Sequence, residues 1–150
     1  MRVAEIMTRD VQTISSFDTI QKAAMAMDNL NVGALPVCDG EELRGVITDR
    51  DITVRATAAG LSPVDIKVGD IMSEDVDYVF EDDDVSKAAT KMKERQVRRL
   101  PVINQSKRLV GFVSLGDLAT KADSGNSADA LESVSTPSQP DRGKRSKKPG

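Results

Sequence analysis

Apolar residues recur at helical spacing in two stretches of the chain. Each stretch follows a polar segment that carries acidic residues, "SSFDT" in the first case and "FEDDD" in the second. The apolar positions are Ile20, Ala23, Ala24 and Met27 in the first stretch, and Val85, Ala88, Ala89 and Met92 in the second. Because positions i, i+3, i+4 and i+7 share one face of a helix, the pattern predicts two amphipathic helices.

Two apolar runs separated by a polar turn follow each predicted helix. The runs are "GALPVC" and "LRGVIT" after the first helix, and "RRLPVI" and "LVGFVS" after the second. Such runs predict two strands joined by a turn. A shorter apolar run, "DVQTI" or "DVDYV", precedes each helix, and a further helix is expected to begin at Asp49 or Leu115. The first of these further helices is expected to end at Gly60. The predicted order is β-α-β-β-α, twice.

The two halves of this pattern are copies of one sequence unit. Residues 3–38 align with residues 68–103 without gaps, and 14 of the 36 aligned pairs are identical. The second copy then gains one residue in its polar turn, after which Leu43, Gly45 and Asp51 align with Leu109, Gly111 and Asp117. Chance does not produce identity of this density, so the sequence contains an internal repeat.

The repeat predicts the domain organisation. A unit of about fifty residues buries too little surface to be stable alone, so each copy is expected to complete the core of the other. We therefore expect a mixed α/β (α+β) fold in which repeat 1 (residues 1–62) and repeat 2 (residues 63–122) pack through their sheets with pseudo-twofold symmetry. Residues 123–150 are rich in Ser, Pro and Gly, which predicts a disordered polar tail. Its basic end, "RGKRSKKPG", favours a solubilising role, with nucleic acid or an acidic partner as the open alternative.

Composition excludes several kinds of chemistry. The 150 residues include no histidine and one cysteine, Cys38, so an imidazole base, a histidine metal ligand and a thiolate zinc cage are excluded. A lone cysteine makes a cytoplasmic protein the default expectation. No apolar stretch approaches the ~18 residues that span a bilayer. The net charge of −3 gives no reason to expect general affinity for nucleic acid.

A hydroxyl residue and a carboxylate recur where the last strand of each repeat gives way to a helix. Thr48 precedes Asp51 by three residues, and Ser114 precedes Asp117 by the same spacing. One interpretation is a capping box, in which the hydroxyl and the acid bind backbone N–H groups at the helix start. The other is a ligand site, because a hydroxyl can donate to a phosphate and a carboxylate can accept from a ribose cis-diol. The two interpretations are compatible.

The same residues carry a resemblance to a known family. "VGALPVCDGEELRGVITDRDI" and "VRRLPVINQSKRLVGFVSLGDL" resemble two CBS domains, a pair also called a Bateman module. The likeness extends from about Val3 to Ala122, and the layout resembles stand-alone two-CBS proteins of the hypoxic response protein type. The resemblance implies binding of adenosine compounds such as AMP, ADP, ATP or S-adenosylmethionine as ligands, with no obligatory cofactor. It also implies a homodimer and the regulation of a separate effector protein.

The resemblance assigns roles to individual residues. It implies that the Asp of each motif, Asp51 or Asp117, holds a ribose, and that the Thr or Ser, Thr48 or Ser114, reaches a phosphate. Other ligand contacts are implied for Arg98 and Arg99 at the phosphate of the second repeat, and for Thr13 and Tyr78 near the base. The first repeat has Gly33 and Ala34 in place of the two arginines, and Arg50 is its compensating cation. We therefore expect two unequal sites.

Two further features have structural interpretations that we prefer to functional ones. The acidic run Glu81–Asp84 is expected to favour a helix start through the helix dipole rather than to bind Mg²⁺. Cys38 aligns with Ile103, so a buried small hydrophobic side chain is expected rather than a redox-sensitive thiol. No metal site is predicted.

Two functional hypotheses remain open. The first is a regulatory module that binds an adenosine nucleotide and modulates a separate partner. The second is a structural or interaction protein whose clefts are empty and which acts through its dimer surface or its tail. No set of residues supplies both a nucleophile and a general base, so an enzyme is not predicted.

Overall fold

The computed structural model describes residues 1–121 of the chain, and these residues form two compact units. The α1 unit comprises Gln12–Val76, and the α4 unit comprises Met1–Val11 together with the described residues from Asp77 onward. Helices and strands alternate in each unit, which confirms the mixed α and β fold that the sequence predicts. The predicted polar tail at 123–150 lies outside the described residues.

The α1 unit is built on a two-stranded antiparallel sheet. Its elements are α1 (Ile20–Leu30), β1 (Ala34–Asp39), β2 (Glu42–Thr48), α2 (Asp49–Asp51), the π-helix η2 (Ile52–Thr57) and α3 (Val68–Ile71). The Thr19 side chain caps α1 by accepting a hydrogen bond from the Lys22 N–H at 3.2 Å. The face of α1 that carries Ile20, Ala23 and Met27 is buried, as its helical spacing predicts, but Ala24, the fourth position of that predicted pattern, is exposed.

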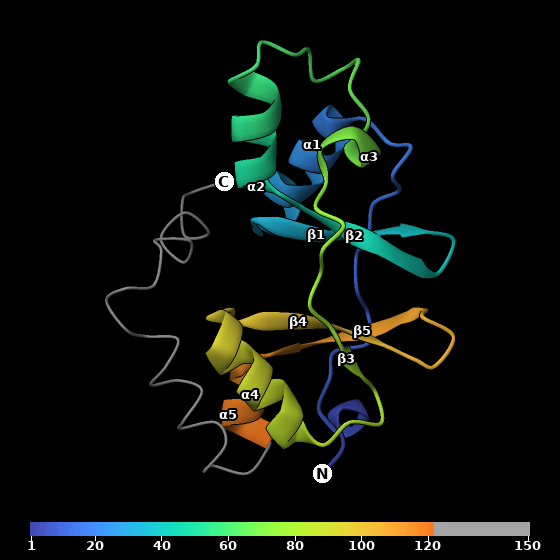
Figure 1. The fold of residues 1–150 in the computed structure, drawn as a ribbon, viewed down its shortest axis with the longest axis vertical. Coiled ribbons are helices and arrows are strands. Elements are labelled where there is room, and N and C mark those ends of the chain that lie inside the picture. The colour runs from blue at the N-terminus through green and yellow to red at the C-terminus, as the bar shows by residue number, and fades with distance from the viewer. Residues whose placement is uncertain (122–150) are drawn as a thin grey trace. The chain divides into compact units, whose positions relative to one another are not determined.

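The α4 unit is built on a three-stranded sheet with the order β3-β4-β5. Its elements are η1 (Val3–Glu5), β3 (Val79–Phe80), α4 (Val85–Arg95), β4 (Arg99–Ile103), β5 (Leu109–Ser114) and α5 (Leu115–Lys121). Strand β3 is parallel to β4, and β4 is antiparallel to β5. Helices α1, α2 and α3 lie on one side of the sheet in the α1 unit, and α4 and α5 lie on one side of the sheet in the α4 unit (Figure 1). In each unit a core of aliphatic side chains joins helices and strands.

Each unit is completed by a short segment that comes from the sequence of the other repeat. We call residues 1–8 the N-terminal strap and residues 66–73 the linker strap. Thr8 and Phe112 exchange backbone hydrogen bonds at 2.8 and 2.9 Å, and Ser73 and Val46 do so at 2.9 and 3.0 Å. The N-terminal strap thus pairs with β5 of the second repeat, and the linker strap pairs with β2 of the first, so the compact units exchange these segments across the repeat boundary.

Two of the predicted elements differ in extent from the prediction. The run "DVQTI" forms only an isolated parallel bridge between Ile14 and Val37, whereas its counterpart forms β3. The helix expected from Asp49 to Gly60 ends at Thr57, and Gly60 adopts a φ of +75° in the turn that follows. Within residues 1–121, no helix is long and apolar enough to cross a membrane. The cytoplasmic location stays a prediction.

Candidate functional site

The motif in the α1 unit forms a reciprocal pair of hydrogen bonds at the start of α2. The Asp51 N–H donates to Thr48 Oγ1 at 3.0 Å, and the Thr48 N–H donates to Asp51 Oδ2 at 2.9 Å. The second carboxylate oxygen, Oδ1, lies 3.8 Å from Arg55 Nε, and the Asp51 side chain is only 14% exposed. The capping box that the spacing predicts is therefore present.

The motif in the α4 unit repeats this geometry. The Asp117 N–H donates to Ser114 Oγ at 3.0 Å, and the Ser114 N–H donates to Asp117 Oδ2 at 2.9 Å. Asp117 Oδ1 lies 3.5 Å from Lys121 Nζ, and the Asp117 side chain is 13% exposed. Two sequence copies have thus produced the same local structure, with a cation one helical turn after each carboxylate.

Capping leaves part of each motif able to bind a ligand. An ionised carboxylate has about four acceptor sites on two oxygens, and the backbone N–H uses one site on Oδ2. A hydroxyl that accepts from a backbone N–H still has its own proton to donate. Each motif therefore offers one hydroxyl donor and one carboxylate oxygen, Oδ1, that no backbone N–H occupies. This oxygen faces Arg55 in the α1 unit and Lys121 in the α4 unit at ion-pair distance.

The residues just before the first strand of each hairpin lie beside the motif. In the α4 unit Arg99 is the register partner of Ser114, and the Leu115 N–H donates to the Arg98 carbonyl at 2.8 Å. The structure therefore brings Arg98 and Arg99 together with Ser114 and Asp117, and both arginines are exposed.

The α1 unit has the same backbone arrangement with different side chains. Ala34 is the register partner of Thr48, and the Asp49 N–H donates to the Gly33 carbonyl at 2.9 Å. A Cβ atom added at Gly33 would lie 3.2 Å from Asp49 Oδ2, so the Asp49 carboxylate packs against this glycine. Asp49 is not among the predicted site residues. Its alignment with Leu115, an acid paired with an apolar residue, is the sequence signal that the two repeats differ in charge at this position. Arg50, the predicted compensating cation, is exposed on the same turn.

The two residues predicted near a base are placed differently. Tyr78 is half-buried, its ring meets the Phe80 ring edge-on at 5.7 Å between centroids, and Lys91 Nζ lies 5.4 Å from its centroid. Lys91 also donates a hydrogen bond to the Tyr78 carbonyl. Thr13 is exposed beside the bridge residue Ile14. Among residues 1–121, no hydrogen bond joins Tyr78 or Thr13 to the motif of its own unit.

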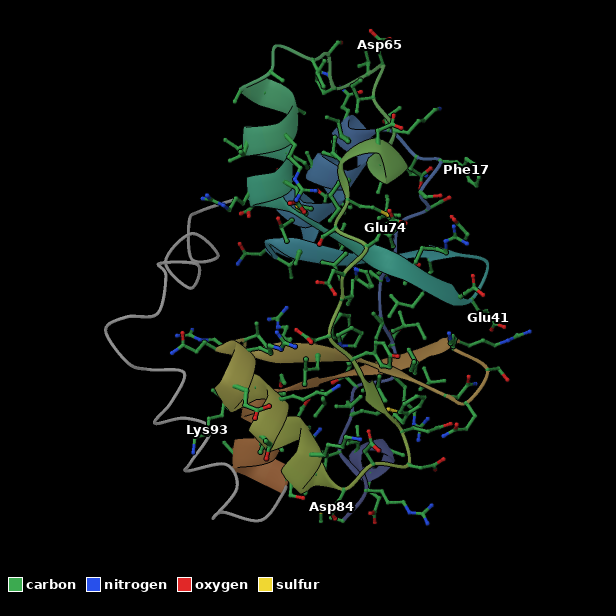
Figure 2. All side chains as sticks on the ribbon, viewed as in Figure 1. Phe17, Glu41, Asp65, Glu74, Asp84 and Lys93 are labelled. Carbon is green, nitrogen blue, oxygen red and sulfur yellow. The ribbon has the colours of Figure 1, made fainter. Side chains whose placement is uncertain are left out.

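The last residue of the acidic run, Asp84, caps the start of α4. Asp84 accepts from the Ser86 N–H at 3.0 Å, and its hydrogen bonds with Ser86 are the main reason that its pKa is lowered to about 2. Figure 2 shows Asp84 at the beginning of this helix. The Phe80 N–H donates to Asp83 Oδ2 at 2.8 Å, and Arg2 lies 3.6 Å from Asp82. In the described part of the chain, no three His, Cys, Asp or Glu side chains are grouped as metal ligands.

Cys38 is a buried side chain of β1. It is 6% exposed, and burial, with a smaller effect of the neighbouring Asp39 charge, raises the pKa of its thiol to about 11. A thiol in this state is protonated at neutral pH and is a poor nucleophile. The prediction that Cys38 packs as a small hydrophobic residue is confirmed.

Comparison with known proteins places this geometry in a family. The sequence profile of the CBS domain matches residues 3–56 and 68–123. The chain is 41% identical over 134 residues to the CBS domain-containing protein YhcV of Bacillus subtilis, covering 89% of this chain and 94% of that protein. It resembles the crystal structure of Hypoxic Response Protein I with two coordinated zinc ions, with a TM-score of 0.72 and 37% identity over 79% of this chain and 97% of the other.

A third relative was solved with ligands. The CBS domain pair of protein MJ0100, in complex with 5′-methylthioadenosine and S-adenosyl-L-methionine, matches with a TM-score of 0.65 and 29% identity, covering 79% of this chain and 93% of the other. The family match covers both sequence repeats, and the hydroxyl–carboxylate motif occurs at the same place in each. The chain therefore belongs to the CBS domain family and contains two copies of the domain.

Proposed function

We propose that this protein is a regulatory module that binds adenosine nucleotides and modulates a separate partner protein. The observation that carries the proposal is the motif geometry, present once in each unit, in which a capped helix start still offers a hydroxyl donor and a carboxylate oxygen. The MJ0100 relative, solved with two adenosine compounds, supports a ligand of this class.

In this proposal, different residues contact the ribose, the 5′ substituent and the base of the ligand. Asp51 and Asp117 accept hydrogen bonds from ribose hydroxyls through Oδ1, since Oδ2 already binds a backbone N–H. Thr48 and Ser114 donate to the 5′ substituent. The remaining contacts are proposed for Arg98 and Arg99 at a phosphate in the α4 unit, Arg50 at the corresponding place in the α1 unit, and Thr13 and Tyr78 near the base.

Regulation requires a partner that responds to the ligand. A ligand shifts an equilibrium between two states only by the difference in its affinity for them, so the effector protein must contact a surface that differs between these states. AMP, ADP, ATP and S-adenosylmethionine are the candidate ligands. We propose no catalytic role.

Thermal unfolding with a panel of adenosine and guanosine compounds tests this function. A site filled at 100 times its Kd adds ~2.7 kcal/mol to the free energy of unfolding. This corresponds to an increase in Tm of several degrees, at roughly 2–4 °C per kcal/mol. We expect adenosine compounds to raise the Tm and the matched guanosine compounds to do so less. A Tm that no adenosine compound changes would reject the proposal.

A second candidate function, protein interaction without a ligand, is favoured by exposed apolar side chains in the α1 unit. Phe17 is 74% exposed, Met25 on α1 is 60% exposed and Val54 on η2 is 49% exposed. The residues aligned with Met25 and Val54 in the α4 unit are Thr90 and Thr120, both exposed and polar. We propose that the exposed apolar side chains of α1 and η2 are covered by a second copy of the chain in a homodimer, which either function can use.

A further inference from the structure

The two units differ in charge at one place beside the hydroxyl–carboxylate motif. The backbone there is the same, because Asp49 binds the Gly33 carbonyl at 2.9 Å and Leu115 binds the Arg98 carbonyl at 2.8 Å. The side chains are not the same. The α1 unit has the Asp49 carboxylate against Gly33. The α4 unit has Arg98 at the place of the glycine and Leu115 at the place of the acid, and this leucine is 8% exposed and packs in the core.

The Asp49 carboxylate lies at the surface between strand and helix. Asp49 is half-buried, and its Oδ2 approaches within 3.2 Å of the position that a Gly33 Cβ would occupy. Asp49 also directly follows Thr48, the residue that donates to the 5′ substituent of a ligand in the proposed function. A negatively charged substituent bound by Thr48 would therefore lie close to a second negative charge.

In the α4 unit the charges beside the hydroxyl of the motif are positive instead of negative. The residue that follows Ser114 is Leu115, which carries no charge and packs its side chain in the core. Arg98 directly precedes the adjoining strand β4 and Arg99 begins it, both are exposed, and Arg99 is opposite Ser114 in the register of β4 and β5. A phosphate bound by Ser114 would lie beside cations, which favour it through charge-assisted hydrogen bonds.

We propose that Asp49 determines the specificity of the α1 unit by excluding adenosine compounds with an anionic 5′ substituent. The α1 unit takes adenosine compounds whose 5′ substituent is uncharged or cationic, and the α4 unit takes 5′-phosphorylated ones. This inference rests on the proposed function and adds the class of ligand that each unit accepts. It also narrows that function, because the Asp49 carboxylate then opposes the phosphate contact proposed for Arg50 in the α1 unit. Gly33 is needed for this arrangement, because a larger residue there would displace the Asp49 carboxylate.

Calorimetric titration with two probes, AMP and 5′-methylthioadenosine, tests the proposal on the full chain. Both probes contain adenosine, and only AMP is negatively charged at the 5′ position. We expect wild type to bind AMP at the α4 unit alone. Asp49→Asn keeps the size and the backbone hydrogen bond of Asp49 but removes its charge. We expect this variant to gain a second AMP site or to strengthen a weak one about tenfold, as the removal of a like charge a few ångströms away allows.

The same titrations contain readouts that a purely structural effect would not change. Affinity for 5′-methylthioadenosine should stay within about twofold in Asp49→Asn, and the gain in AMP affinity should diminish at high salt, because salt screens exposed charges. Asp65→Asn is the matched control, since it removes one carboxylate from an exposed turn of the same unit. Figure 2 shows Asp65 at the end of the α1 unit away from β1 and β2.

Each contrary outcome identifies what has failed. If wild type binds both probes with equal affinity at two sites, or if Asp49→Asn changes both probes equally, the role of Asp49 is wrong and the proposed function stands. If Asp65→Asn strengthens AMP binding as much as Asp49→Asn does, the effect is one of net charge and the role of Asp49 is again wrong. If wild type binds neither probe, the proposed function fails, and the inference fails with it.

Discussion

At the scale of single residues, the Asp39 carboxylate binds two serines in a contact that the alignment of the repeats does not predict. Asp39 ends β1, and its two oxygens accept hydrogen bonds from the Ser15 hydroxyl at 3.1 Å, the Ser16 hydroxyl at 2.7 Å and the Ser16 N–H at 3.0 Å. Its counterpart Asn104 instead accepts from N–H groups within its own turn. The alignment shows that these two residues differ. It does not reveal the serines, because they lie 23 and 24 positions from Asp39.

We predict that this contact makes stability depend on pH. The hydrogen bonds from Ser16 are the largest cause that lowers the pKa of Asp39 below its usual value. A carboxylate whose pKa is lowered by folding stabilises the protein above its unfolded pKa of about 3.9, and this stability is lost as the pH falls through the folded pKa. Asp39→Asn should therefore lower the urea midpoint at pH 7, and the difference from wild type should shrink below about pH 4.

Glu42→Gln is the control for this experiment, because Glu42 is exposed and its carboxylate meets only Arg44 among the described residues. Its midpoint should stay close to that of wild type at both pH values. A deficit for Asp39→Asn that is as large at pH 3 as at pH 7 would show that packing, and not charge, explains its effect.

At the scale of elements, the straps explain why one glycine recurs in each repeat. A Cβ atom at Gly45 would lie 2.5 Å from the Ser73 carbonyl oxygen, and one at Gly111 would lie 2.6 Å from the Thr8 carbonyl oxygen. The strap backbone therefore passes directly over the strand at a distance that only glycine allows. Alignment predicted that these glycines correspond, but the straps have no periodic pattern from which their partners could be inferred.

We predict that Gly45→Ala and Gly111→Ala each destabilise the protein by about 1–3 kcal/mol, the usual cost of inserting a methyl group into a packed site. Chemical denaturation measures this loss directly. Gly116→Ala is the control, because its Cβ would have one ordinary contact, with Ser114 Oγ at 3.6 Å, and alanine favours a helix. Wild-type stability in Gly45→Ala would mean that the linker strap does not lie on β2.

Other elements could be predicted because their signals are local. The helices α1 and α4 follow from apolar spacing within eleven residues each, and the capping boxes follow from a hydroxyl and an acid three positions apart. The exchange of straps between repeats depends on the pairs Val46–Ser73 and Thr8–Phe112, which lie 27 and 104 positions apart, and no local pattern encodes them. The contact between Asp49 and Gly33 belongs to the same nonlocal class.

At the scale of the whole molecule, the exposed apolar side chains on α1 and η2 predict a homodimer. We expect the wild-type chain to be a dimer by light scattering at tens of micromolar. Met25→Glu should shift it toward the monomer, because burying an unpaired charge in an interface is costly. Thr90→Glu, at the aligned position of α4, should leave the dimer intact. A monomeric wild type, or a Met25→Glu variant that stays dimeric, would contradict this interface.

The central claim is that Asp51 and Asp117 bind a ribose in addition to capping a helix. Asp→Asn at either position removes the charge and keeps the size. If capping were the whole role, each variant would lose at most ~1 kcal/mol of stability, and nucleotide affinity would not change. Hydrogen bonds to charged groups are worth ~1.5–3 kcal/mol each, so loss of a ribose contact should weaken Kd at least about tenfold.

The most direct measurement is calorimetric titration of wild type, Asp51→Asn and Asp117→Asn with AMP and ATP. We predict a Kd at least about tenfold weaker in Asp117→Asn for both nucleotides, because Arg98 and Arg99 lie beside that motif. We predict no change in Asp51→Asn, because Asp49 is expected to exclude both anionic nucleotides from the α1 unit. Equal affinities in all three proteins would contradict the ribose assignment. Absence of heat with every adenosine compound, wild type included, would favour the interaction protein instead.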